Sequence, residues 1–272
     1  MELHTPHLLL RHRVAWVVWV RRAVWLLLPL VLVASFWRSG CIGCAVFGLV
    51  VSGLLAAALS AWERSLRRQF IRDAVIPRYL VAKLQAAHPQ LKAGDAELVL
   101  RGLRQFFMAH LRSGGKFVAM PSRAVDTAWH EFILHTKAYQ GWCNVAFGAM
   151  LHHTPAEVLG RDPKRNDGLR RSWYWACKEE SIDPRKPARL PLLFALDRKF
   201  AIPGGFSYVP DCSAINRAGS SGDHCGTSFG ESSDGAGDAG GFGGSESSSS
   251  GDGGSDGGSG CGGGGCGGGG GD

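Results

Sequence analysis

Apolar residues are distributed along the chain in three ways: two unbroken runs near the N-terminus, an intermittent pattern through the middle, and almost none at the end. The first run covers residues 23–37 and the second covers residues 41–62, and neither contains a charged residue. A helix needs about 20 apolar residues to cross a hydrocarbon core of about 30 Å, so the second run is long enough. The first run reaches only about 22 Å at about 1.5 Å per residue.

The shorter run can still span a bilayer if the arginines that flank it snorkel and the bilayer thins locally. The polar break at residues 38–40 then forms the tip of a hairpin. We therefore predict a two-span transmembrane hairpin over residues 23–62. Cleavage of the first run as a signal peptide is the alternative, and Val33-Ala34-Ser35 offers the small residues for it. A second, longer apolar run follows directly, which disfavours cleavage.

Residues 1–22 are basic and enclose an apolar patch at residues 14–20, which is too short to span a bilayer and is typical of an interfacial segment. Arginines flank the predicted hairpin on both outer sides, whereas its connection holds one. By the positive-inside rule both ends lie in the cytoplasm. We expect a bacterial inner-membrane protein with its soluble domain and tail on the cytoplasmic side.

Between residues 63 and 210 the apolar positions recur at steps of three and four residues, which predicts amphipathic helices. No run alternates as a strand would, so this range is expected to form a soluble helical bundle. Residues 211–272 are rich in Gly and Ser, and from residue 219 onward 25 of 54 residues are Gly. Such a composition buries too little apolar area to fold, so we predict a disordered tail. The fold class is mainly α.

Charge is divided unevenly along the chain, whose net charge is +7. All 30 Lys and Arg precede residue 219, and the tail after it holds eight acidic residues. A basic body suits contacts with anionic lipid. Nucleic acid is not expected as a partner, because the sequence contains no recognition motif that combines aromatic and basic residues.

The stretch from residue 121 to 155 gathers the residues best suited to chemistry and reads as one long helical stretch. Asp126 and His130 are four residues apart and share a helix face. Such a pair supports a metal ligand or general base, or simply stabilises the first helical turn. A bend near Gly141 or Gly148 would add His152 or His153. The set would then hold a divalent metal with an open coordination position.

Two other patterns in this stretch carry less chemistry. His130 and His135 are five residues apart, so on an unbroken helix they diverge by about 140° and cannot form a zincin motif. His135, Tyr139 and Cys143 recur every four residues beside apolar positions. We interpret this ladder as a packed seam with a satisfied core histidine, and Trp129 as a packing residue. Candidate functional residues are therefore Asp126, Trp129, His130, His135 and Tyr139.

Cys261 and Cys266 are separated by four glycines in the tail. The spacing allows a soft metal or an internal disulfide, but glycines preorganise neither, so we interpret them as two free thiols in a reducing cytosol.

The pattern Val125-Asp126-x-x-Trp129-His130, followed by Tyr139, Cys143, Phe147-Gly148 and His152-His153-Thr154-Pro155, resembles the core of bacterial glycine-rich domain-containing proteins. It is more distantly similar to the helical domain of plant glycine-rich domain proteins. The resemblance covers residues 120–155 well and residues 63–210 loosely. The family pattern often has a second His two residues after the Trp-His pair, where this chain has Phe132. The resemblance implies architecture and no reaction.

Two functions follow as hypotheses. The first is a membrane-anchored helical binding or interaction module for an unidentified protein or small molecule, without a reaction of its own. The alternative is a metal-dependent enzyme, such as a hydrolase, which uses Asp126, His130 and either His152 or His153. The acidic tail could also fold over the basic body as an autoinhibitory cover.

Overall fold

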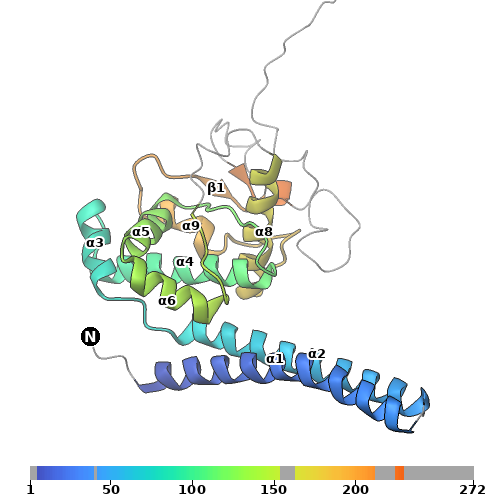
Figure 1. Ribbon diagram of the computed structural model, residues 1–272. Helices are drawn as coiled ribbons and strands as arrows, with labels where there is room; N and C mark the ends of the chain where they lie inside the picture. Colours follow the sequence, from blue (N-terminus) through green and yellow to red (C-terminus); the bar gives the residue numbers. More distant parts are fainter. Residues whose placement is uncertain (1–4, 40–41, 154–162, 212–223, 230–272) are drawn as a thin grey trace, which may run out of the picture.

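The computed structural model describes residues 5–39, 42–153, 163–211 and 224–229 and shows a mainly helical protein, as the periodicity predicts (Figure 1). Within these residues the helices are α1 (Thr5–Ser39), α2 (Ile42–Asp73), α3 (Tyr79–Ala87), α4 (Ala93–Arg112), α5 (Arg123–Leu134), α6 (Thr136–Ala146), α8 (Pro163–Glu179) and α9 (Leu192–Lys199). Strand β1 (Tyr208–Val209) pairs in parallel with β2 (His224–Cys225), and a 3₁₀ helix, η1, covers Thr227–Phe229. Residues 154–162, 212–223 and 230–272 lie outside the described residues. Within the tail predicted over residues 211–272, residues 224–229 form β2 and η1, because Phe229 is buried against Trp173.

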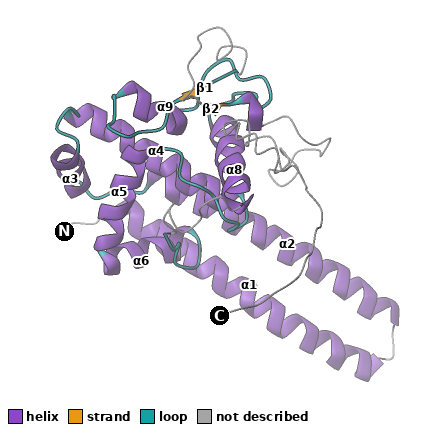
Figure 2. Cartoon of the chain, turned by 90° about the horizontal axis from the view of Figure 1, so that it is seen from above, coloured by secondary structure: helices purple, strands orange, loops and turns teal. Residues whose placement is uncertain are grey.

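Helices α1 and α2 form a long antiparallel hairpin that extends from one side of the molecule (Figures 1 and 2). Both helices continue past the apolar runs that define the predicted spans, so neither residue 22 nor residue 62 is a helix boundary. Val14 and Val17, expected in an interfacial patch, are buried in the protein core. They pack there because the N-terminal part of α1 lies alongside α2 and near α6.

The two halves of the hairpin have different surroundings. Near the helical domain, residues such as Leu10, Leu66 and Phe70 belong to the core. The distal half instead leaves large apolar side chains exposed to the surroundings; among them are Trp25, Leu26, Val46, Phe47, Leu49 and Leu54. Among the described helices, only the segment Val46–Asp73 is long and apolar enough to cross a membrane. Within its most apolar stretch of 18 residues, only 17% is buried inside the protein.

Helix α4 is the centre of the helical domain. Helices α2, α3, α5, α8 and α9 all pack against it (Figure 2). Its apolar residues recur at three- and four-residue steps, and Val99, Leu103 and Phe106 are fully buried. Each such side chain contributes about 1.5–3 kcal/mol when removed from water. Helix α5, which carries the polar residues described below, therefore packs against a well-buried helix.

The expectation of one long helical stretch across residues 121–155 is wrong. Helix α5 ends at Leu134 and α6 starts at Thr136, because His135 adopts φ −88° and ψ 59°.

Candidate metal centre

The start of helix α5 is fixed by side chains at its own N-terminus and from α9. Ser122 is the N-cap and its hydroxyl accepts a hydrogen bond from the Val125 amide. The buried carboxylate of Asp197 accepts from the Ser122 hydroxyl at 2.6 Å and from the amides of Arg123 and Ala124 at 2.7 and 3.1 Å. A carboxylate is stabilised at the positive end of a helix, where amide groups lack partners within the helix. These bonds set the position of α5.

Asp126 and His130 project from the same face of α5, as their spacing predicts. His130 Nδ1 lies 3.7 Å from Asp126 Oδ2. Trp129, the residue before His130, is buried against Phe106 of α4, with ring centroids 4.9 Å apart. The helix thus presents an acid and an imidazole to the surface and anchors itself through the indole.

The chain then reverses and brings a second imidazole to this face. Helix α6 ends at Ala146, and Gly148 adopts φ +86°, a backbone conformation that L-residues other than glycine rarely take. Residues 148–153, which we name the return segment, run back toward α5. His153 Nε2 ends 3.0 Å from Asp126 Oδ1. One of the two bends considered from the sequence, at Gly148, is therefore present.

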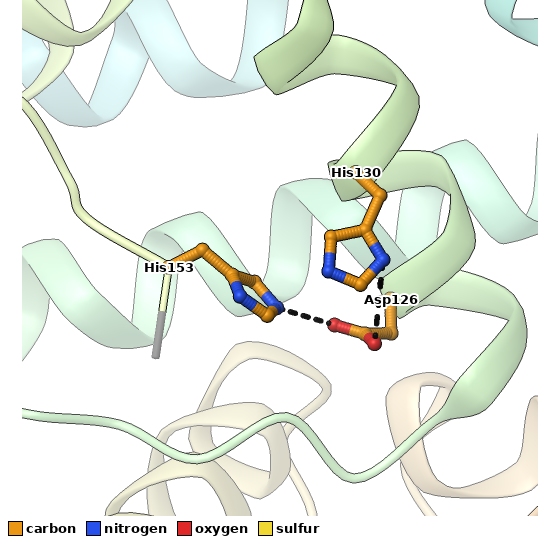
Figure 3. A group of neighbouring side chains, drawn as sticks. All are labelled: Asp126, His130 and His153. Atoms are coloured by element: carbon orange, nitrogen blue, oxygen red, sulfur yellow. Dashed lines mark hydrogen bonds and ion pairs between the residues drawn. The ribbon is translucent and has the colours of Figure 1, made fainter. Parts of the chain in front are cut away.

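Asp126, His130 and His153 form one cluster in which one ligand atom from each residue lies within 4.8 Å of the others (Figure 3). The carboxylate lies beside both rings, with one oxygen toward each, and the centroids of the two rings are 4.2 Å apart. The side chain of His153 is 14% exposed, that of Asp126 31% and that of His130 52%. One side of the cluster is therefore fixed by protein while the other faces solvent.

Hydrogen bonds that link α5, α6 and the return segment fasten the chain two residues before His153. The Tyr139 hydroxyl donates to the carbonyl of Leu151 at 2.6 Å and accepts from Trp129 Nε1 at 3.0 Å. The edge of the His153 ring meets the Trp129 ring, with centroids 4.6 Å apart. Burial raises the pKa of Tyr139 well above its usual range, so the hydroxyl keeps its proton and remains a donor.

The donor set of this cluster fits a divalent transition metal. Two imidazoles and one carboxylate are typical ligands for zinc, iron or manganese, and three protein ligands leave positions open. Bonds of about 2.0–2.2 Å in a tetrahedral site place two ligand atoms of one ion about 3.4 Å apart. The ligand atoms of the cluster lie within 4.8 Å of one another, so a bound ion would draw the side chains together by up to about 1.4 Å.

The remaining candidates lie elsewhere. His152 is exposed and is not a member of the cluster, although it is adjacent to His153. The prediction that His135 is a satisfied core histidine is wrong, because its side chain is exposed and stacks on Tyr79 at 4.0 Å. His135 does not share the buried helix face of Tyr139 and Cys143, because the helix breaks at this residue. Cys143 remains buried and burial raises its pKa, which keeps it a neutral thiol. Cys261 and Cys266 lie outside the described residues.

Sequence reasoning missed Asp197, which determines where α5 begins. The only signal was an acid in an otherwise apolar turn, Leu192–Leu196 followed by Asp197, because buried acids are rare without partners. Nothing in the sequence connects it to Ser122, 75 residues earlier.

A separate groove of ≈ 950 Å³ lies between the end of α2, α4 and α9. Six basic and three acidic residues line it together with aliphatic side chains; the charged ones are Arg72, Arg78, Arg101, Arg104, Arg189, Lys199, Glu97, Glu179 and Glu180. Arg72 pairs with Glu179, and Arg189 pairs with Glu180. Burial lowers the pKa of Arg104, so this cation is partly withdrawn from water. The groove suits anionic groups.

Comparison with known protein families gives a match that includes Asp126, His130 and His153. The UCP032817-like family matches residues 66–229, from the last part of α2 to η1. No curated protein and no solved structure matches the chain. Since the match covers more than half of the 272 residues, the chain belongs to the UCP032817-like family.

Proposed function

We propose that this protein is a membrane-anchored helical module whose soluble domain binds a divalent metal ion through Asp126, His130 and His153. The single observation that carries the proposal is the convergence of these three ligands from α5 and the return segment. Because 27 residues separate Asp126 from His153, the cluster is made by the tertiary fold rather than by local helix geometry. Its exposed side leaves room for a further ligand of the ion.

The anchoring part of the proposal assigns two membrane spans to the distal half of the α1–α2 hairpin. Support comes from the exposed apolar side chains of this half and from the long apolar segment of α2. Within α1 the corresponding segment is residues 23–39, which reach about 25 Å at about 1.5 Å per residue. Exposed arginines, such as Arg22 and Arg64, lie near the domain end of the hairpin, where anionic lipid headgroups would meet them.

Two observations bear on the orientation in the membrane, and they favour opposite sides. The excess of arginine outside the apolar runs favours a cytoplasmic domain in an inner membrane. Cys225, however, is disulfide-bonded, and disulfides persist mainly in oxidising compartments. We propose the cytoplasmic orientation. Labelling Cys261 and Cys266 with a membrane-impermeant thiol reagent on intact cells tests it, since labelling from outside requires the opposite orientation.

Binding without a reaction is the function that we favour. A bound ion would act as a Lewis acid, and zinc lowers the pKa of a coordinated water to about 7. Metal-dependent hydrolysis is the second candidate, because the solvent-facing side of His130 leaves the ion accessible. The likeness to glycine-rich domain-containing proteins stays a proposal, and it adds no substrate.

The basic groove supports a binding role for a second, anionic partner, either a protein or a small molecule. Arg78, Arg101 and Lys199 line it and are exposed. Among the described residues no carboxylate pairs with any of these three. The proposal of a metal-binding module does not depend on this groove.

Metal content of the purified full-length chain tests the metal proposal. Expressed and purified without chelators, the protein should carry close to one zinc, iron or manganese ion per chain by elemental analysis. Asp126→Asn and His130→Ala should each lose most of it, because two remaining ligands hold such an ion poorly. A chain without metal that also fails to take up added zinc would contradict the proposal.

A further inference from the structure

Two charged residues are buried where the hairpin meets the helical domain. Glu63 and Arg67 of α2 are only 6% and 7% exposed. Arg67 donates from Nε and Nη2 to the same oxygen of Glu63, at 2.9 and 2.7 Å. Removing two charges from water costs several kcal/mol for each, which good geometry and additional hydrogen bonds must offset. The buried pair therefore needs further polar partners, and other helices supply them.

The first partner ties the pair to α1. Nη1 of Arg21 lies 2.9 Å from the second carboxylate oxygen of Glu63. Arg21 is about one-third exposed, whereas Glu63 is buried. The charge of Glu63 is thus shared between an arginine of α1 and an arginine of α2. Any change in how α1 packs against α2 alters that sharing.

The second partner ties the pair to the end of α6. Nη1 of Arg67 donates to the carbonyl of Val145 at 2.8 Å and lies 3.4 Å from that of Asn144. Carbonyls in the last turn of a helix lack partners within the helix and carry partial negative charge. Arg67 therefore acts as a C-terminal cap supplied from another helix.

The same guanidinium touches the beginning of the return segment. A Cβ atom on Gly148 would lie 3.0 Å from Nη2 of Arg67. The guanidinium thus packs directly against the backbone at the point where the chain turns back toward α5. The return segment is held at this end by Arg67 and further along by the bond from Tyr139 to Leu151.

We propose that Arg67 is a positioning residue for His153, and that Glu63 makes this positioning depend on how α1 packs against α2. The inference rests on the proposed metal-binding function, because it treats His153 as a ligand of the ion. Asp126 and His130 lie on α5, so His153 is the ligand whose position depends on the return segment. If the distal half of the hairpin lies in a membrane, the arrangement of its helices there would influence metal affinity. The membrane anchor and the metal centre would then be coupled through three side chains.

A double variant tests the positioning step without leaving a lone buried charge. Glu63→Gln with Arg67→Met removes both charges, because loss of one partner alone strands the other. In the full-length chain in detergent micelles, zinc affinity measured by chelator competition should fall by about 10- to 100-fold, as for other outer partners of metal ligands. The matched control is Arg68→Met, which changes the neighbouring arginine of α2. Its affinity should stay close to that of the wild type.

Arg21→Ala tests the link to α1, because Arg21 contacts Glu63 but none of the metal ligands. Its zinc affinity should fall by a few-fold, in the same direction as that of the double variant. Wild-type affinity in Arg21→Ala would overturn the coupling to α1. Wild-type affinity in the double variant would overturn the positioning role itself.

Hydrogen exchange of the backbone amides gives a readout that does not require metal. Amides of residues 147–153 should exchange faster in the double variant than in the wild type, while those of α4 keep their protection. If the wild type binds no metal, the proposed function fails but faster exchange still supports positioning by Arg67. Unchanged exchange in this segment overturns the inference whether or not metal binds.

Discussion

The hydroxyl of Tyr139 donates a hydrogen bond to the carbonyl of Leu151 across 2.6 Å and thereby fastens the return segment to α6. The same hydroxyl accepts from Trp129 Nε1. One buried atom therefore connects α5, α6 and the segment that carries His153. This relationship positions His153 without a hydrogen bond from the hydroxyl to its imidazole.

Replacing Tyr139 with Phe should destabilise the protein. The change leaves the Trp129 indole N–H and the Leu151 carbonyl without their partner, and a buried polar group left unsatisfied costs about 1–3 kcal/mol. Denaturant unfolding of the full-length chain in detergent measures the loss. Tyr79→Phe is the matched control, since the Tyr79 hydroxyl is buried and has no hydrogen-bond partner among the residues that the structure describes. An equal effect in the two variants would contradict the role given to Tyr139.

Asp197→Asn should destabilise the start of α5. The carboxylate accepts from Ser122 and three backbone amides, including that of Phe206 at 3.0 Å. An amide side chain keeps only one acceptor oxygen, and charge-assisted bonds contribute about 1.5–3 kcal/mol each, so we expect a loss of at least about 2 kcal/mol. Asp183→Asn, at an exposed turn, should cost less than about 1 kcal/mol. Thermal or denaturant unfolding that ranks the two variants equally would argue against the cap.

Two glycines near the return segment should respond to alanine in opposite ways. Gly148 has φ +86° and its Cβ would press on Arg67, so Gly148→Ala should cost about 1 kcal/mol or more. Gly141 lies inside α6 with open space around it, so Gly141→Ala should stabilise by about 0.5–1 kcal/mol. Comparing the unfolding midpoints of the two variants with that of the wild type tests whether the turn requires glycine at position 148. Equal shifts would mean that the turn at Gly148 tolerates a side chain.

Stability should fall in mild acid because of His110. Burial lowers its pKa in the folded protein, despite the contact of Nδ1 with the Lys116 carbonyl. The unfolded chain, with a pKa of about 6.5, then binds the proton more readily than the folded one. Stability is therefore full above about pH 6.5, decreases as the pH falls below it and levels off below the folded-state pKa.

Melting curves of the metal-free protein between pH 7.5 and pH 5 measure this effect. His110→Gln cannot take up the proton, so its melting temperature should decline less over the same interval. The pKa of His88 is also lowered by burial, so some decline should persist in the variant. A variant that declines as steeply as the wild type would show that His110 does not contribute.

Much of the fold follows from the hydrophobic pattern, because helix periodicity is a local property. The apolar runs, the amphipathic α4 and the pairing of Asp126 with His130 all depend on residues a few positions apart. The break at His135 could not be predicted, since neither Gly nor Pro marks it and packing against Tyr79 accompanies it.

The long-range parts of the site are harder to read from sequence. Gly148 signals a possible turn, but whether His152 or His153 meets Asp126 depends on the direction of the backbone after that turn. Asp197 and Ser122 meet only because α9 packs against α5. Arg67 and Val145 likewise come together through the contact between α2 and α6. Such partners are set by tertiary packing, for which one sequence holds no local signal.

The most direct test of the metal centre uses the two neighbouring histidines of the return segment. His153→Ala removes a ligand that lies 3.0 Å from Asp126, whereas His152→Ala removes an exposed imidazole outside the cluster. Zinc binding to the full-length chain should be measured for both variants and the wild type by equilibrium dialysis. We predict one tightly bound ion for the wild type and for His152→Ala, and loss of tight binding for His153→Ala. Equal binding by the two variants, or none by the wild type, would contradict the account.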